Sequence, residues 1–129
     1  MARKASDQPT DVELAILRVL WRRGPTSVRE VHEALASTRD TGYSTTLKMM
    51  QVMFEKGLLL RDESQRPQLY SPAVPEEQTQ GEMVRDLMRK VFGGSARKLV
   101  MRAVESESVT AEELAEIRKL LKKLEGDKQ

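Results

Sequence analysis

The sequence predicts a mainly α-helical protein with one small β-hairpin, in two parts that meet at Pro75. Three observations lead to this prediction. Residues 10–57 contain three segments with helical apolar spacing, separated by short links. Two short apolar runs then flank a polar connection, as in a hairpin. Beyond Pro75 the apolar spacing is helical throughout, and in the last segment it is like that of a coiled coil.

Two capping boxes predict where the first two helices begin. In "TDVELAILRVLWRRG", the Thr10 hydroxyl can accept from the amide of Glu13 while the Glu13 carboxylate reaches back. Ser27 and Glu30 repeat this spacing in "TSVREVHEAL". The apolar residues after each box recur three or four apart: Leu14, Leu17 and Trp21, then Val28, Val31 and Leu35. Gly24-Pro25 ends the first of these helices.

A third helix is expected in "YSTTLKMMQVMFEKG", with Ser44 as its cap and Gly57 as its end. One side has the spacing of a core stripe: Thr46, Met49 or Met50, and Met53. The residues that face away are Thr45, Lys48, Gln51 and Val52. Hydroxyl, amide and ammonium groups of this kind hydrogen-bond phosphates and base edges in a major groove about 12 Å wide.

The runs "LLLR" and "QLYS" predict the hairpin that follows. Three short helices and then a hairpin is the order of a winged helix-turn-helix domain, and we assign this domain to residues 1–75. In a winged helix the third helix is the one that reads DNA, so we expect this role for the helix of Tyr43 to Gly57. Basic residues bracket that helix in the sequence and end at the tip of the wing, where they can bind phosphates. The candidate DNA-binding residues are Arg39, Ser44, Thr45, Lys48, Gln51, Lys56 and Arg66.

Residues 76–129 are predicted to form three more helices. Gly93-Gly94 ends the first, and Thr110 with Glu113 forms a third capping box that opens the last. A long exposed apolar stripe on a monomer would be an association hazard, so we expect these helices to pack against a second copy of the chain. The candidate dimerisation residues are Met83, Leu87, Val91, Leu99, Leu114, Ile117, Leu121 and Leu124.

The charge of the chain is mildly basic, with a formal net charge of +2. Residues 1–75 hold 11 Lys and Arg against 9 Asp and Glu, whereas residues 76–129 hold 11 of each, so the excess lies in the first part. No apolar run approaches the roughly 18–20 residues that span a bilayer, and the opening residues have no apolar signal region. We therefore expect a cytoplasmic protein without membrane insertion, with disorder only in residues 1–8 and 126–129.

Composition argues against catalysis and metal binding. The chain has no cysteine and one histidine, His32, which lacks neighbours with metal-ligand or triad spacing. We expect no enzyme activity, no metal and no cofactor. Trp21 and Tyr70 are expected to be packing residues, with the Tyr70 hydroxyl near solvent.

The chain resembles the penicillinase-repressor family of winged-helix transcriptional regulators, the BlaI/MecI/CopY type. The matching stretches are "ELAILRVLWRRGPTSVREVHEAL", "YSTTLKMMQVMFEKGLLLR", "LYSP", "FGGSARKLVMRAV" and "TAEELAEIRKLL", which cover most of residues 11–124 in order. The resemblance implies a homodimeric repressor that binds double-stranded DNA at a palindromic operator. It implies DNA contact by the third helix at Thr45, Lys48 and Gln51, and by the wing at Arg66.

Three departures limit what the resemblance implies. Family members often have arginine where Val52 stands, so base reading from that position does not carry over. Copper-responsive members have a C-terminal cysteine cluster, and this chain has no cysteine, which excludes a copper sensor of that kind. Antibiotic-responsive members are inactivated when a membrane-bound sensor protease cuts an Asn-Phe bond, and the matching pair here is Arg102-Ala103. Release by proteolysis at this pair, with such a protease as partner, is therefore a hypothesis.

The residues also fit two other classes of protein. A winged-helix interaction module or adaptor would use the same weakly cationic helix to hold another protein without specific DNA binding. An antitoxin-like dimer would instead use its C-terminal helices on a non-self partner. Salt separates these alternatives, because a repressor that makes several phosphate contacts loses affinity steeply as salt rises, whereas a protein-binding module has little DNA affinity at any salt.

Overall fold

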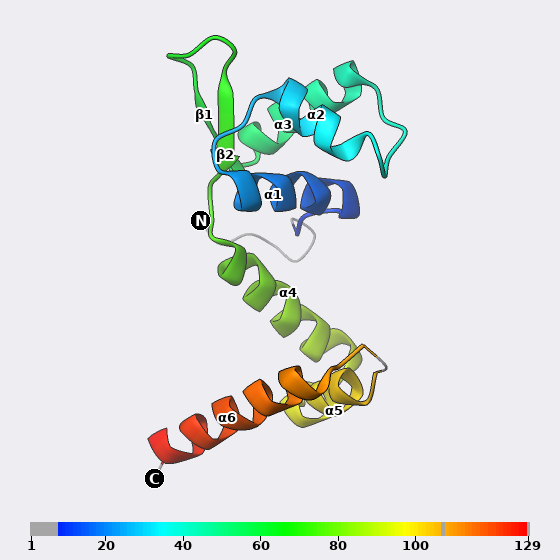
Figure 1. The fold of residues 1–129 in the computed structure, drawn as a ribbon, viewed down its shortest axis with the longest axis vertical. Helices are drawn as coiled ribbons and strands as arrows, with labels where there is room; N and C mark the ends of the chain where they lie inside the picture. Colours follow the sequence, from blue (N-terminus) through cyan, green and yellow to red (C-terminus); the bar gives the residue numbers. More distant parts are fainter. Residues whose placement is uncertain (1–7, 107, 129) are drawn as a thin grey trace. The chain divides into compact units, whose positions relative to one another are not determined.

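The computed structural model describes residues 8–106 and 108–128 of the chain. Contacts divide the chain into two compact units, Met1–Met83 and Val84–Gln129. The described residues form six α-helices and one two-stranded antiparallel hairpin, so the predicted class, mainly α with a small hairpin, is confirmed (Figure 1). Three helices followed by a hairpin give the first unit the architecture of a winged helix.

α1 (Asp11–Arg23) and α2 (Val28–Leu35) begin at the predicted capping boxes. Glu13 N donates to Thr10 Oγ1 at 3.2 Å, and Thr10 N donates to Glu13 Oε1 at 2.9 Å. Ser27 and Glu30 make the same reciprocal pair. Gly24 ends α1 with a φ of 80°, which only glycine adopts without steric cost. Local side-chain chemistry therefore sets both helix starts and the end of α1, as predicted.

α3 (Tyr43–Glu55) starts earlier than the sequence suggested, and the prediction that Ser44 caps it was wrong. The cap is Gly42, which has an extended backbone and no side chain to bond the free amides. The Gly42 carbonyl accepts from Thr46 N at 3.1 Å and from Thr46 Oγ1 at 3.3 Å. Because the buried Thr46 anchors the start of the helix in this way, Ser44 lies inside the first turn and its side chain stays exposed.

β1 (Leu59–Asp62) and β2 (Leu69–Pro72) form the predicted hairpin. Arg61 lies opposite Tyr70 in its register. Tyr70 also exchanges two backbone hydrogen bonds of 2.9 Å with Thr26, which ties the link between α1 and α2 to the hairpin. The expectation that the Tyr70 hydroxyl lies near solvent was wrong, because this double pairing carries the side chain into the core, where it is 1% exposed.

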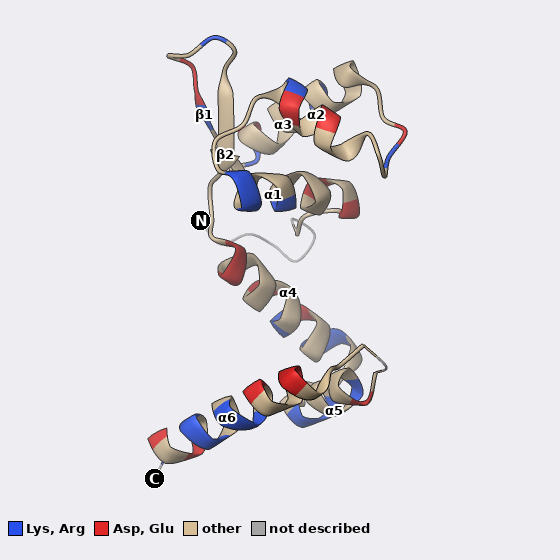
Figure 2. Ribbon diagram, in the orientation of Figure 1, with Lys and Arg blue, Asp and Glu red and all other residues tan. Residues whose placement is uncertain are grey.

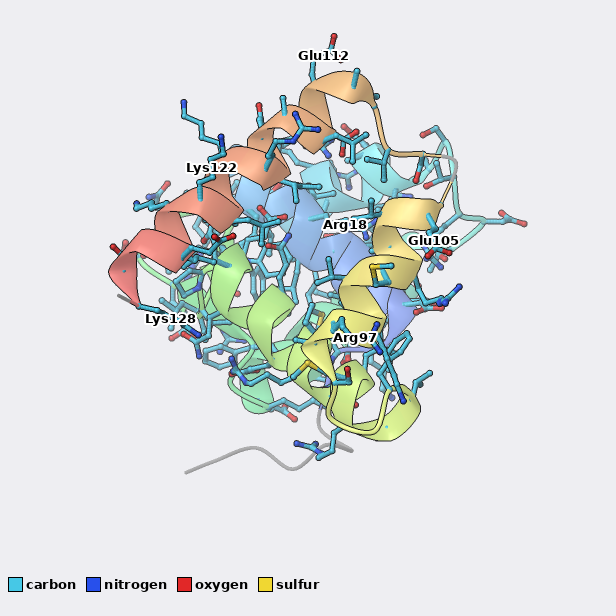
Figure 3. All side chains as sticks on the ribbon, turned by 90° about the horizontal axis from the view of Figure 1, so that it is seen from below. Arg18, Arg97, Glu105, Glu112, Lys122 and Lys128 are labelled. Atoms are coloured by element: carbon cyan, nitrogen blue, oxygen red, sulfur yellow. The ribbon has the colours of Figure 1, made fainter. Side chains whose placement is uncertain are left out.

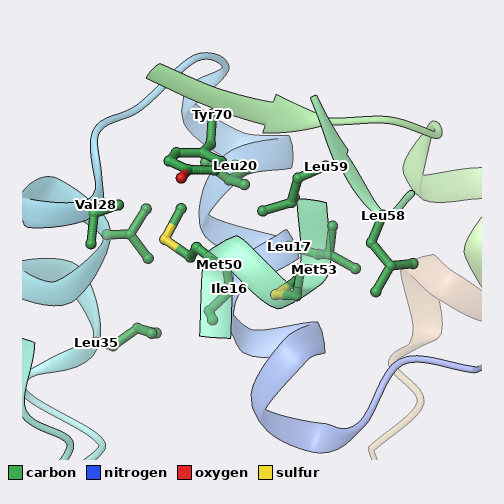
Figure 4. Close-up of a cluster of buried hydrophobic side chains, with 11 residues drawn as sticks. Ile16, Leu17, Leu20, Val28, Leu35, Met50, Met53, Leu58, Leu59 and Tyr70 are labelled. Atoms are coloured by element: carbon green, nitrogen blue, oxygen red, sulfur yellow. The ribbon is translucent and has the colours of Figure 1, made fainter. Parts of the chain in front are cut away.

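One hydrophobic core fills the space enclosed by α1, α2, α3 and the hairpin (Figure 4). Its buried side chains are Ile16, Leu17, Leu20, Val28, Val31, Leu35, Met50, Met53, Leu58, Leu59 and Tyr70. Met50 and Met53 are fully buried, so the predicted inward side of α3 is confirmed. Met49 is only partly buried and packs against this cluster. Methionine suits these places because its flexible side chain fills irregular gaps.

α4 (Glu76–Val91), α5 (Ala96–Glu105) and α6 (Ala111–Asp127) follow as predicted. Gly94 N donates to Met88 O at 2.9 Å past the end of α4, and the glycine stop is confirmed. The capping box of Thr110 and Glu113 is present at the start of α6. The expected disorder was wrong for Gly126 and Asp127, which belong to α6, since one glycine costs a helix only about 1 kcal/mol. Residues 1–7 and 129, which also belong to the predicted disordered ends, lie outside the described residues, whereas Gln8 and Lys128 are described.

The second unit has almost no interior of its own. Asp86, paired at 2.9 Å with both Arg89 and Lys90, is the one buried residue among the described residues of this unit. Its exposed large apolar side chains are Val84, Leu87, Val91, Val100, Met101, Leu120, Leu121 and Leu124. Figure 2 shows acidic residues at the start of α6 and basic residues further along it. Figure 3 shows the charged side chains of Glu112 and Lys122 projecting from this helix. Apolar and charged groups are therefore both open to water on α6.

Candidate nucleic-acid interface

The outward side of α3 carries the polar face that the sequence predicts. Thr45, Lys48 and Gln51 are exposed, and each is three residues from the next, so they lie about 60° apart around the helix. None of the three side chains makes a hydrogen bond or an ion pair with another described residue. Ser44 is exposed on the same side, at the start of the helix. One narrow face of α3 therefore presents hydroxyl, ammonium and amide groups that are free to bind a ligand.

Lys56, a predicted phosphate contact at the end of α3, is paired within the protein. Its Nζ lies 3.1 Å from Glu13 Oε2, and the Glu13 side chain is only 8% exposed. Burial has the largest single influence on the pKa of Glu13, and it raises this pKa. Hydrogen bonds from Thr10 and Lys56 act in the opposite direction and together outweigh burial. The pKa of Glu13 is therefore lowered from its ordinary value of 4.5. The Lys56 ammonium is half-exposed, so it has one partner already and still faces solvent.

The wing is organised by an acidic turn that leads to Arg66. The Asp62 carboxylate accepts from both the amide and the hydroxyl of Ser64, and these hydrogen bonds lower the pKa of Asp62. Arg66 is exposed near the tip, and its Nη1 donates to the carbonyls of Glu63 at 3.0 Å and Gln65 at 3.2 Å. The Arg66 guanidinium is thus held close to its own backbone with other donors still available.

Arg61 joins the wing to α3, a role that sequence reasoning missed. Its guanidinium carbon lies 4.1 Å from the centre of the Phe54 ring, and its Nη2 lies 2.7 Å from Glu63 Oε1. A cation over an aromatic face is attracted by the ring quadrupole. No local pattern could have predicted this contact, because Phe54 ends a helix while Arg61 belongs to a strand, and only the turn between them brings the two together.

A second contact missed at the sequence level lies between α2 and the first turn of α3. The guanidinium carbon of Arg29 lies 5.1 Å from the centre of the Tyr43 ring, and the His32 ring meets the Tyr43 ring edge-on at 5.9 Å. His32 is half-buried, in agreement with the expectation of a surface or partly buried histidine. Arg39, predicted to bind phosphate, lies half-buried in the link before α3, where its backbone amide donates to Leu35 O at 2.9 Å.

A hollow of ≈ 500 Å³ opens between the start of α1 and the outward side of α3. It is lined by Glu13 from α1 and by Ser44, Thr45, Lys48, Met49 and Val52 from α3. Val52 was predicted to face away from the core, and it is half-buried in the wall of this hollow. The hollow therefore combines polar side chains of α3 with two apolar ones, Met49 and Val52.

Within residues 8–106 and 108–128, no three histidine, cysteine, aspartate or glutamate side chains gather where they could hold a metal ion. No helix in the described part of the chain is long and apolar enough to cross a membrane.

Comparison with known sequences gives the family. The sequence model of the penicillinase repressor family matches residues 9–123. A transcriptional regulator BlaI of Mycobacterium tuberculosis is 35% identical over 118 residues, which is 90% of this chain and 84% of the relative. A penicillinase repressor of Bacillus licheniformis is 22% identical over 98% of both chains. The methicillin resistance regulatory protein MecI of Mammaliicoccus sciuri is 23% identical over 88% of this chain and 93% of its own. With its helix order, its wing and this match over most of its length, the chain belongs to the penicillinase repressor family.

Proposed function

We propose that the chain is a homodimeric transcriptional repressor that binds double-stranded DNA in a sequence-specific way at a palindromic operator. The observation that carries this proposal is the exposed face of α3, where Thr45, Lys48 and Gln51 have no partner among the described residues. The opposite side of α3 is packed into the core, so this face is held rigidly. The names of the relatives, which describe regulators and repressors, support the same function.

The proposal divides the candidate residues by chemistry. Lys48 and Gln51 carry donors and an acceptor that suit base edges in the major groove. Arg39 and Arg66 lie before α3 and on the wing, where cations bind phosphates without reading sequence. Lys56 contributes less to binding than these two, because its ammonium is shared with Glu13.

The protein acts in the cytoplasm, where bacterial DNA is found.

The experiment is a selection of duplexes from a random pool, followed by titration of the selected duplex against salt. A repressor that makes several phosphate contacts yields a palindrome and loses roughly 10³-fold or more in affinity between 50 and 200 mM salt. A winged-helix module that binds another protein yields no preferred duplex and little DNA affinity at any salt. That second outcome would overturn the proposal.

We propose residues 76–129 as the region that forms the homodimer. Neither α5 nor α6 buries a residue within the protomer, and Leu87, Leu121 and Leu124 are each about half-exposed. A second copy would cover these side chains. Leu114 and Ile117 are partly buried at helical spacing from Leu121 on α6, and Leu99 is partly buried on α5. Two-fold symmetry then sets the half-sites about one helical turn of DNA apart, or a multiple of it.

We also propose that induction acts by cleavage in α5, at Arg102-Ala103, by a membrane-bound sensor protease. Both residues are exposed, and Arg102 pairs with Glu105 at 3.0 Å on the surface of the same helix. A helix without buried residues opens locally at low free-energy cost, which would bring the bond into an extended form that a protease can hold. The test is to incubate the chain with a candidate protease and to map the fragments. An uncut chain in cells whose target genes are induced would contradict this route.

A further inference from the structure

We propose that the hollow between α1 and α3 receives the C5-methyl group of a thymine in the major groove, and that Val52 and Met49 thereby determine sequence specificity. This inference rests on the proposed DNA-binding function. It assigns base recognition to Val52, a residue that cannot hydrogen-bond a base, since valine has neither a donor nor an acceptor on its side chain.

The arrangement of the lining residues places the apolar groups beside the polar ones. Ser44, Lys48 and Val52 are each four residues apart and form one row along α3, and Thr45 and Met49 form the neighbouring row. The wall therefore changes along the helix, from hydroxyl groups in its first turn to apolar side chains further along. A duplex that places a base edge against Lys48 brings the neighbouring base edges to the apolar end of the hollow.

Within the described part of the chain, no contact with the core explains why Val52 is apolar. The core cluster and the partly buried side chains packed against it include Met49 but not Val52. Val52 is nevertheless half-buried and lines the hollow. The helix thus fixes the position of the Val52 isopropyl group, and one side of this group is open to a ligand in the hollow. Met49 packs against the core and contributes a second, flexible apolar side chain to the lining of the hollow.

Thymine is the base that fits this surface. Among the four bases it alone presents a methyl group in the major groove, and apolar side chains read that group by contact. Among the described lining residues, Glu13 is the one that would disfavour DNA, but its carboxylate is bonded to Lys56 Nζ at 3.1 Å and is almost entirely buried. The described part of the lining therefore presents no free anion to a duplex.

The experiment replaces thymine by uracil, which removes only the methyl group. Starting from the best duplex of the selection described above, each thymine is replaced in turn and the affinity of the full chain is measured. For one thymine in each half-site we expect about a fourfold loss per half-site, which corresponds to the ~0.8 kcal/mol of one buried methylene-sized group. For Val52→Ser and for Val52→Asn, which both remove the two methyl groups of the valine side chain, we expect the ratio of thymine to uracil affinity at that position to fall towards one.

Lys48→Ala is the matched control on the same row of α3, and it should weaken binding while keeping the thymine preference. A ratio near one at every thymine in the wild-type chain would overturn the inference, as would an unchanged ratio in both Val52 variants. Thermal melting of each variant checks that the fold is intact. Failure of the proposed function is a different result, since it would leave no preferred duplex on which to measure the ratio.

Discussion

Glu13 at the start of α1 and Lys56 just after α3 are joined by an ion pair of 3.1 Å, although they are 43 residues apart in the chain. The same carboxylate closes the capping box with Thr10. Glu13 therefore fixes the start of one helix and the end of another, and it does so beside the hollow on the reading face of α3. This pair links the stability of the domain to the geometry of its candidate DNA surface.

The Glu13 pair should make stability depend on pH. Because the pKa of Glu13 is lowered on folding, its ionised form stabilises the fold above the ordinary value of 4.5, and this contribution is lost as the pH falls through the folded pKa. Glu13→Gln keeps an acceptor for the Thr10 amide but removes the charge. We expect this variant to lose up to about 1 kcal/mol at pH 7, since Lys56 is half-exposed, and to match the wild type at low pH. Urea unfolding from pH 3 to 7 measures the difference, and a constant gap over that range would contradict the assignment.

The base-reading and phosphate-binding groups should respond differently to truncation. Lys48→Ala and Gln51→Ala should change which base pairs are preferred at one or two positions of the half-site, by about 1–3 kcal/mol each. Arg66→Ala should weaken binding to all duplexes alike and reduce the salt dependence by about one counterion. Competition between the selected duplex and its single-base variants measures both effects. Identical effects from the three substitutions would contradict this division of roles.

The contact of Arg61 with Phe54 should stabilise the wing. Arg61→Lys keeps the charge but loses the flat guanidinium that stacks on the ring, so we expect a lower free energy of unfolding. In a Phe54→Leu background the same substitution should cost clearly less, because the ring is already absent. A double-mutant cycle in urea measures this coupling. Equal costs in the two backgrounds would show that the stacking contributes nothing.

Leu121→Asp should convert the proposed dimer into monomers. Leu121 is 48% exposed in the protomer, and a carboxylate at this position would have to be buried unpaired in the proposed interface. Sedimentation equilibrium measures the change. Lys119→Asp is the matched control, since residue 119 is exposed and lies about 160° around α6 from Leu121, and this variant should remain dimeric. A monomeric wild type would remove the dimer proposal.

Many local features could be predicted from the sequence because they depend on neighbours within one helical turn. The boxes at Thr10, Ser27 and Thr110 are each closed by a glutamate three residues away, and all three are present. The inward side of α3 follows from helical spacing in the same way. The cap of α3 was mispredicted because the buried Thr46 hydroxyl, and not the preferred capping residue Ser44, anchors the first turn at Gly42.

The sequence by itself determined the helix starts, the apolar stripes and the outward position of Thr45, Lys48 and Gln51, since periodicity and short-range hydrogen bonds act along the chain. Only the tertiary structure decided that Lys56 is paired with Glu13, that Tyr70 is buried against Thr26 and that Val52 lines a hollow. Each of these depends on which distant segments the core brings together. The packing of α1, α3 and the hairpin fixes those distances, and no local spacing encodes them.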